Sequence, residues 1–286
     1  MEAYESFARV YDDLMDNIPY EEWADYILQL LHEYHINDGL LAELGCGTGN
    51  ITELLANAGY DMIGIDNSTE MLEIANEKKQ EHHLPSILYL LQDMREFELF
   101  GTVNAIICVC DSINYLLDPN EITKVFRLAN NYLEAGGLFI CDFKTRHYFK
   151  DIVADSTIAE DREDVSFIWD NYYDEESNIN ELALSLFIRE AISAHCDNFH
   201  NRDSRKNDSS SNAPALYRKY QEFHYQRGLT IEEMKHCIDA SGMELVTMYD
   251  AFTHHTATED SERIYVIARE KKQEGKYYIK ERTYKQ

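Results

Sequence analysis

The chain has 286 residues, of which 44% are hydrophobic, and its formal net charge at pH 7 is −27. This length and composition allow one large domain, or one domain with a sizeable insertion. So acidic a surface disfavours a nucleic-acid substrate, and no apolar stretch approaches the length of a membrane span.

The first segment, residues 1–35, is expected to be helical. Its opening stretch "MEAYESFARVYDDLMD" carries charges throughout, so it lacks the apolar region of a secretion signal. An apolar stripe at helical spacing runs along this stretch and comprises Tyr4, Phe7, Tyr11, Leu14 and Met15. Such a stripe is typical of a helix packed on a core.

Residues 36–150 alternate short apolar runs with amphipathic segments. The runs expected to form strands are 39–44, 60–66, 86–91, 103–110 and 136–143. Most are apolar on both faces, which is typical of buried parallel strands. The segments 50–59, 68–80 and 120–136 have helical spacing, with Gly59 and Gly136 at the expected helix ends. The alternation predicts an α/β fold with a doubly wound sheet.

The pattern changes in residues 151–228, which we interpret as a small antiparallel β insertion. Three aromatic-rich segments in it alternate in polarity, as antiparallel strands do: 164–174, 178–190 and 215–228. Between the last two lies the polar stretch 191–214, with almost no apolar anchors. This composition predicts a disordered loop.

Residues 229–270 return to the core pattern. A helix is expected at 230–242, where Thr230 and Glu233 have the spacing of a capping box, and two strands follow it. The stretch from Arg263 to Gln286 holds eight Lys and Arg residues against three Glu. Its end, the basic tail 271–286, is either a solvated terminus or a docking site for RNA.

Six cysteines are spread along the chain without a CxxC pair, and most lie inside apolar runs. This distribution is typical of reduced, buried thiols, so we expect a cytoplasmic protein. Because paired cysteine ligands are missing, no structural metal site is expected.

The segment "LAELGCGTGN", residues 41–50, follows the first predicted strand. A dinucleotide-binding loop has the pattern G-x-G-x-x-G, whereas Gly45, Gly47 and Gly49 form G-x-G-x-G and Asn50 takes the place of the last glycine. The first two glycines still permit a tight turn and close backbone approach to a ligand. Glu43 favours a ligand that carries an ammonium group and opposes a pyrophosphate, so a nicotinamide enzyme is disfavoured.

Two carboxylates follow at the ends of the next predicted strands. Asp66 lies 17 residues beyond Gly49, where a carboxylate can accept both hydroxyls of a ribose. Asp93 is placed to accept from an exocyclic adenine amine, with Met94 beside the ring. Either aspartate alone could cap a helix or a turn. In order and at successive strand ends, together with the glycine loop, they indicate a nucleoside-containing ligand.

These stretches, "ELGCGTGN", "GIDNSTEMLEIA" and "LQDMREF", resemble motifs I, II and III of class I S-adenosylmethionine-dependent methyltransferases. From residue 1 to about 270 the chain is similar to small bacterial members that begin with a Y..FA..YD.LM element. That group is related to glycine N-methyltransferase and to sugar-amine N,N-dimethyltransferases. The resemblance implies a Rossmann-like, seven-stranded sheet with its last strand antiparallel. It also implies S-adenosylmethionine as cofactor at the carboxyl ends of strands one to four.

The resemblance implies that the cofactor is bound by Tyr4, Glu43, Gly45, Gly47, Asp66, Met71, Asp93, Met94 and Asp111. Glu43 and the two glycines would line the methionine moiety, Asp66 would hold the ribose, and Asp93 would contact the adenine. The N-terminal helical segment would then be a lid whose tyrosines touch the cofactor, since tyrosine faces suit a sulfonium cation. The stretch 191–214 departs from the shorter hairpin connection that is usual in this group.

The fourth predicted strand ends in "CVCDSINYL", which places Asp111, Asn114 and Tyr115 at the rim beside the sulfonium. Methyl transfer needs alignment of acceptor and methyl carbon, and an amine acceptor must also lose a proton. Candidate catalytic residues are Tyr11, Asp111 and Tyr115. Asp111 could equally cap the turn that follows.

The insertion contributes six further candidates for the acceptor side: Trp169, Tyr172, Tyr173, Phe223, His224 and Tyr225. Because side chains alternate along a strand, only every second one is expected to face the site. His224 could be a general base, although a histidine in an aromatic strand is also compatible with a structural role.

Three functions remain open. The first is transfer of a methyl group to nitrogen or oxygen of a small polar molecule. The second is an RNA or protein methyltransferase that docks through the basic tail. The third is a non-catalytic module that binds the cofactor and a partner. The sequence carries no signal for the acceptor or for the oligomeric state.

Overall fold

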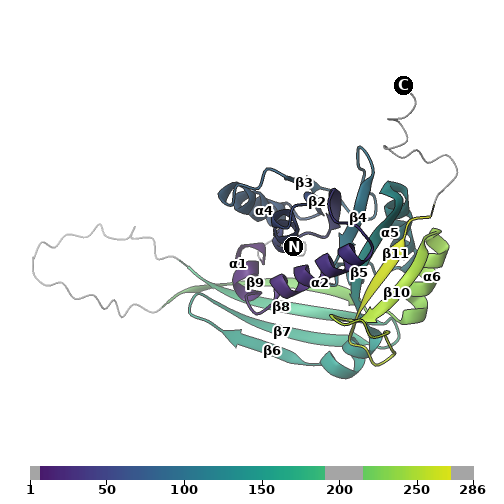
Figure 1. Cartoon of the computed structure of the whole chain (residues 1–286). Helices are drawn as coiled ribbons and strands as arrows, with labels where there is room; N and C mark the ends of the chain where they lie inside the picture. The colour runs from purple at the N-terminus through teal and green to yellow at the C-terminus, as the bar shows by residue number, and fades with distance from the viewer. Residues whose placement is uncertain (1–6, 191–214, 272–286) are drawn as a thin grey trace, which may run out of the picture.

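A seven-stranded sheet forms the centre of the computed structural model, which describes residues 7–190 and 215–271 (Figure 1). Its strand order is β10-β11-β5-β4-β1-β2-β3. The strands are β1 (Leu40–Leu44), β2 (Asp61–Asp66), β3 (Ile87–Leu91), β4 (Val103–Cys108), β5 (Leu133–Lys144), β10 (Glu244–Asp250) and β11 (Arg263–Arg269). Strands β1 to β5 pair in parallel, whereas β11 is antiparallel to both of its neighbours. The predicted α/β fold with an antiparallel last strand is confirmed.

Helices cover both faces of this sheet. They are α1 (Ala8–Leu14), α2 (Tyr20–Glu33), α3 (Asn50–Asn57), α4 (Thr69–Glu81), α5 (Pro119–Tyr132) and α6 (Ile231–Ser241), with short turns η1 (Ser112–Tyr115) and η2 (Tyr148–Val153). Alternate residues of β1 divide between two apolar layers, because side chains of a strand point to opposite faces. Leu41 packs in the cluster that contains α2 and α3, whereas Leu44 packs in the cluster that contains α5 and α6. The cap of α6 is the predicted box of Thr230 and Glu233.

A second, four-stranded antiparallel sheet is formed by β6 (Thr157–Asp161), β7 (Val165–Asp174), β8 (Ile179–Arg189) and β9 (Tyr217–Arg227). The predicted alternation is present, since Tyr173 and His224 are buried while Tyr172, Phe223 and Tyr225 are exposed. Apolar residues of α1 pack on β7 and β8 in one cluster. In Figure 1, α1 lies between this small sheet and α4, one of the helices that flank the large sheet.

The larger differences from the sequence-based expectation concern β5, β4 and β6. The helix expected over 120–136 ends at Tyr132, and β5 begins at the next residue. The pairing of β5 with β4 shifts between Val103 and Ala105, and Gly136 with φ 76° lies in that irregular stretch. Gly136 thus bends a strand instead of ending a helix, which the apolar spacing alone does not distinguish.

The strand expected over 103–110 ends at Cys108 because Cys110 and Asp111 adopt left-handed backbone angles, with φ of 59° and 54°.

The edge strand β6 was not expected from the sequence. All of its residues are exposed, so it has no buried face to produce an apolar alternation.

In residues 7–190 and 215–271, no helix combines the length and apolarity that a membrane span requires.

Candidate active site

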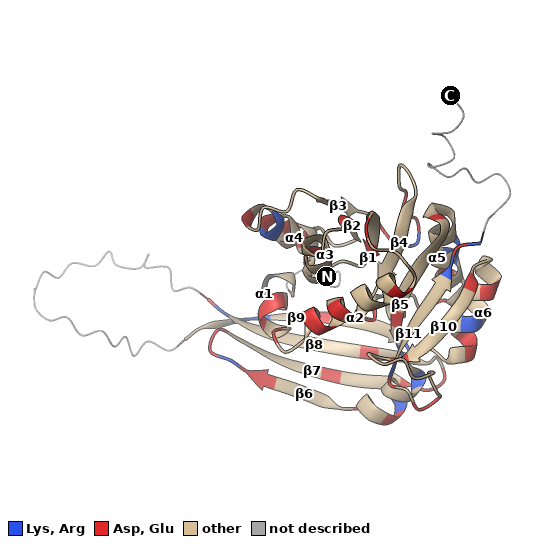
Figure 2. Cartoon of the chain, in the orientation of Figure 1, with Lys and Arg blue, Asp and Glu red and all other residues tan. Residues whose placement is uncertain are grey.

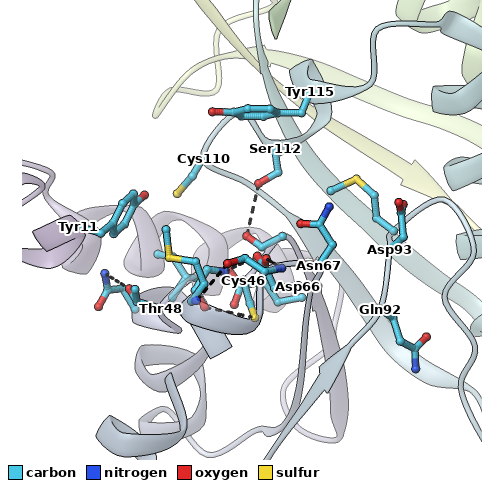
Figure 3. A pocket seen from close by; sticks show the side chains of 18 of the residues that line it. Tyr11, Cys46, Thr48, Asp66, Asn67, Gln92, Asp93, Cys110, Ser112 and Tyr115 are labelled. Atoms are coloured by element: carbon cyan, nitrogen blue, oxygen red, sulfur yellow. Dashed lines mark hydrogen bonds between the residues drawn. The ribbon is translucent and has the colours of Figure 1, made fainter. Parts of the chain in front are cut away.

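A pocket of about 570 Å³ lies at the carboxyl ends of β1 to β4 (Figure 3). Its lining includes these predicted residues: Tyr11, Glu43, Gly45, Gly47, Asp66, Met71, Asp93, Met94 and Tyr115. It also includes residues that sequence reasoning missed, among them Tyr20, Cys46, Thr48, Asn50, Asn67, Ser68, Gln92, Arg95, Cys110 and Ser112. Many of the missed residues adjoin a predicted one at a strand end, which is the signal that could have found them. The predicted residue Tyr4, the loop 191–214 and the tail beyond residue 271 lie outside the described residues.

The glycine loop between β1 and α3 is pressed against the turn that follows β4. Gly45 has φ 69°, and a Cβ atom there would lie 2.6 Å from the Ser112 Oγ. Gly47, with φ 53°, has no neighbouring atom within 4 Å of the corresponding position. Both backbone conformations favour glycine, and the open side of Gly47 leaves room for a ligand close to the backbone.

Glu43 lies at the end of β1, where it is buried and accepts a hydrogen bond from the Thr52 hydroxyl. Burial raises the pKa of this carboxyl to about 8, against the lowering effect of the Thr52 hydrogen bond, and repulsion from Asp66 adds to the rise. An ammonium group bound beside it would restore the charged carboxylate. The site therefore fits the methionine moiety of S-adenosylmethionine.

Asp66 is held firmly at the end of β2. Its Oδ2 accepts from the Gly47 amide at 2.8 Å, and its Oδ1 accepts from the Ser68 amide at 2.8 Å. Burial nevertheless raises the pKa of this carboxyl. Each carboxylate oxygen retains a second lone pair for a ligand hydroxyl. Ribose binding by Asp66 stays a prediction, and this geometry is compatible with it.

Asp93 has a partner that the sequence analysis did not identify. Arg95 Nε lies 2.9 and 3.0 Å from the two Asp93 carboxylate oxygens, and Arg95 Nη1 lies 2.8 Å from a Glu121 oxygen. The Arg95 hydrogen bond holds the pKa of Asp93 below its usual value. The carboxylate expected to contact the adenine is thus oriented by an ion pair at the pocket rim.

Helix α1 is tied to the glycine loop by one carboxylate. Asp12 Oδ1 accepts from the Thr48 hydroxyl at 2.7 Å and from the Asn50 side-chain amide at 2.9 Å. Its Oδ2 pairs with Lys78 Nζ on α4 at 3.0 Å. Burial opposes ionisation, but these hydrogen bonds and the Lys78 charge lower the pKa of Asp12 overall. Asn50, which replaces the third dinucleotide glycine, therefore helps to hold α1 over the pocket.

Asp111 is not among the residues that line the pocket. Its carboxylate lies 2.6 Å from Arg263 Nη2, 3.2 Å from Lys144 Nζ and 3.0 Å from the Gln226 side-chain amide. Burial opposes ionisation, but Lys144 and Arg263 hold the pKa of Asp111 well below its usual range. The structure therefore places Asp111 in an ion network that joins β5, β11 and β9. Direct contact of Asp111 with cofactor or acceptor stays a prediction that this placement does not favour.

The tyrosines approach the pocket from separate elements. The hydroxyl of Tyr11 on α1 lies 3.4 Å from the Tyr20 hydroxyl. Burial raises the pKa of Tyr11 well above its usual value. Tyr115 on η1 has its hydroxyl 3.3 Å from His224 Nδ1. Asn114, predicted at the rim, is fully buried and bonds the backbone carbonyls of Lys144 and Arg227 at 2.8 and 2.7 Å. It thus fixes η1 between β5 and β9 without lining the pocket.

A family model described as "Methyltransferase domain" matches residues 41–137. The "Putative methyltransferase YqeM" of Bacillus subtilis (strain 168) is 32% identical over 272 residues, which are 94% of this chain and 98% of that protein. An S-adenosylmethionine-dependent methyltransferase from Clostridium acetobutylicum ATCC 824 has a similar structure, with a TM-score of 0.77 and 23% identity over 95% of this chain and 100% of that one. SAM-bound CalS10, an amino pentose methyltransferase from Micromonospora echinaspora, has a TM-score of 0.66 and 17% identity over 95% and 98% of the two chains.

Proposed function

Because the chain belongs to the class I S-adenosylmethionine-dependent methyltransferases, we propose that it transfers the methyl group to nitrogen or oxygen of a small polar molecule. S-adenosylmethionine supplies the methyl group and carries the leaving sulfur. The task of the protein is then to bind the acceptor, align it and remove its proton.

The observation that carries this proposal is the tyrosine-lined rim of the pocket. Tyr11, Tyr20 and Tyr115 line it, and the Asp12 contacts hold α1 beside it. Its volume of about 570 Å³ is within the range of roughly 300–1,000 Å³ that is typical of small-molecule sites. A rim of aromatic faces and hydroxyls suits a compact polar acceptor.

The charge distribution supports the same class of acceptor. Asp and Glu recur along α2, α6 and the small sheet, while Lys and Arg are scattered among them (Figure 2). With a net charge of −27, the protein attracts cations and repels polyanions at long range. A neutral or cationic amine is therefore favoured over a phosphorylated polymer. The amino pentose named for CalS10 belongs to this chemical class.

Cofactor-dependent methyl transfer to an unknown acceptor can be tested with labelled S-adenosylmethionine. The intact protein is incubated with a metabolite extract and, separately, with total RNA and with a protein extract. We expect label only in small molecules. The variant Gly45→Ala is the inactive control, because its Cβ atom would displace Ser112 from the loop.

A second variant that ends at Lys271 tests the basic tail. If the proposal holds, this variant methylates the same small molecules as the intact chain. Label in RNA that requires the tail and fades with salt would instead establish the RNA alternative. Label in a protein would establish a protein substrate, and cofactor binding without label in any fraction would identify a non-catalytic module.

A further inference from the structure

Three polar side chains occupy the inner face of β9, where a strand packed on a core is ordinarily apolar. Glu222, His224 and Gln226 are 1%, 2% and 6% exposed, and their spacing of two places them on one face. Burial of polar groups is unfavourable unless they have partners. The inner face of β9 is therefore specialised for polar contacts with the elements that it meets.

Each of these side chains contacts a different segment of the chain beside the pocket. Glu222 Oε1 accepts from the Phe7 amide at the start of α1 at 2.9 Å, and Gln226 donates to Asp111. Between them, His224 Nδ1 lies 3.3 Å from the Tyr115 hydroxyl. Tyr115 is the member of this group that lines the pocket.

Tyr115, His224 and Glu222 form a continuous line from the pocket to a buried carboxylate. His224 Nε2 lies 3.4 Å from Glu222 Oε2, on the side of the ring opposite the contact with Tyr115. A carboxylate beside Nε2 favours the tautomer with the proton on Nε2, in which Nδ1 accepts from the tyrosine hydroxyl. The His224 ring also makes T-shaped contacts with the rings of Tyr115 on η1 and of Phe7, the residue before α1.

We propose that Tyr115, His224 and Glu222 form a relay that takes up the proton released by the methyl acceptor. This inference rests on the proposed function. The acceptor lone pair forms a bond to the methyl carbon as the carbon–sulfur bond breaks, and the electron pair of that bond stays on sulfur. The surplus proton of the acceptor passes to Tyr115 Oη, while the hydroxyl proton of Tyr115 passes to His224 Nδ1. Glu222 stabilises the imidazolium that results, and the proton returns to water after product release.

In this scheme Tyr115 is the catalytic residue, and His224 and Glu222 act through it. Titratable groups that face the relay from the described elements include Glu222 on β9, Tyr115 on η1 and, beyond Tyr115, Tyr11 on α1. A purely structural network would anchor β9 equally well but would not require a particular tautomer of His224. The protonation state of that ring is therefore the property to measure.

The first experiment needs no acceptor. The full chain, labelled with ¹⁵N-histidine, is titrated by NMR between pH 5 and 9 as wild type, Tyr115→Phe and Glu222→Gln. We expect wild-type His224 to carry its neutral-state proton on Nε2, and Glu222→Gln to weaken the preference for that tautomer. Tyr115→Phe should shift the Nδ1 resonance. The exposed His236 on α6 serves as an internal control that stays unchanged.

An Nδ1-protonated neutral ring in the wild type would overturn the relay, as would a tautomer of His224 that is insensitive to Glu222→Gln. These outcomes do not depend on turnover. A failure to find any acceptor would thus refute the proposed function separately from the relay.

The second experiment uses an acceptor found in the metabolite screen. Tyr115→Phe should lower kcat by roughly 10²–10⁴-fold, the usual contribution of acid–base catalysis, while cofactor affinity stays within twofold. Glu222→Gln should shift the acidic limb of the kcat/KM profile to lower pH, and Glu222→Asp should restore part of the shift. Variants that change KM or the unfolding temperature, but leave kcat and the pH profile as in the wild type, would assign these residues a structural role only.

Discussion

The proposed cofactor side and the proposed acceptor side of the pocket are assembled from different kinds of contact. On the cofactor side, Asp66 accepts from Ser68 two residues away and from Gly47 on the adjacent strand–helix loop. On the acceptor side, Tyr115 meets His224 across 109 residues, and the Phe7 amide meets Glu222 across 215 residues. The first set is carried by consecutive strand ends of one sheet, whereas the second depends on how a separate sheet docks.

This difference has a functional consequence. In this proposal, a cofactor common to many methyltransferases would be held by local turns that one sheet can position without help. The proposed acceptor side consists of α1, η1 and the small sheet, so its chemistry could change while the turns around Asp66 stay as they are. Three predictions test whether the two sides are separable, beginning with the largest expected effect.

Glu43, on the cofactor side, should make the free energy of unfolding of the cofactor-free protein fall as the pH rises. Its folded pKa of about 8 exceeds the ordinary value of 4.5, so between these values the folded state holds a proton that the unfolded chain has lost. Stability from this group is therefore present at low pH and lost as pH rises to about 8. Relative to Glu43→Gln, the cofactor-free wild type should lose on the order of 3 kcal/mol between pH 5 and pH 9.

Urea unfolding of both proteins at the two pH values measures this difference. Glu77→Gln on the exposed face of α4 removes the same charge and should leave the wild-type pH dependence unchanged. Parallel pH profiles for wild type and Glu43→Gln would contradict the prediction. They would mean that the unliganded site ionises Glu43 without difficulty.

Asp66→Ala should weaken cofactor binding without disturbing the acceptor side. Loss of hydrogen bonds to a charged group is expected to reduce the affinity for S-adenosylhomocysteine by roughly 1.5–3 kcal/mol. Calorimetry measures this loss, and the NMR signals of His224 should stay in place. Asp61→Ala, at the opposite end of β2, is the matched control. An unchanged affinity in Asp66→Ala would refute the assignment of Asp66 to the ribose.

Asp12→Ala should have the smallest effect, because Asp12 connects the two sides without being central to either. It loses the contacts to Thr48 and Asn50, while its partly exposed pair with Lys78 contributes little. We expect a loss of about 1 kcal/mol in S-adenosylhomocysteine affinity by calorimetry. Asp13→Ala, exposed on the same helix, controls for the charge. If Asp12→Ala lowered the affinity for S-adenosylhomocysteine as much as Asp66→Ala, α1 would belong to the cofactor side, and the two sides would not be separable.

The amino-acid sequence by itself determined the strand–helix alternation, the glycine loop and the carboxylates that follow β2 and β3. These features are local. A buried parallel strand is apolar on both faces, a turn with positive φ requires glycine, and parallel strands bring their carboxyl ends to one edge. Glu43, Gly45 and Asp66 could therefore be placed around one pocket from their positions in the chain.

Only the tertiary structure decided which partners the polar side chains take. Asp111 stands beside pocket residues in sequence, yet its carboxylate pairs with Arg263, 152 residues further along. The edge strand β6 has no buried face, so its sequence lacks an apolar alternation. Glu222 cannot be told from an exposed strand residue in the sequence, and only the packing of β9 near the start of α1 buries it and gives it the Phe7 amide as a partner. Electrostatic and hydrogen-bond partners are selected by distance in space, to within a few ångströms, and the docking of the small sheet on the large one sets those distances.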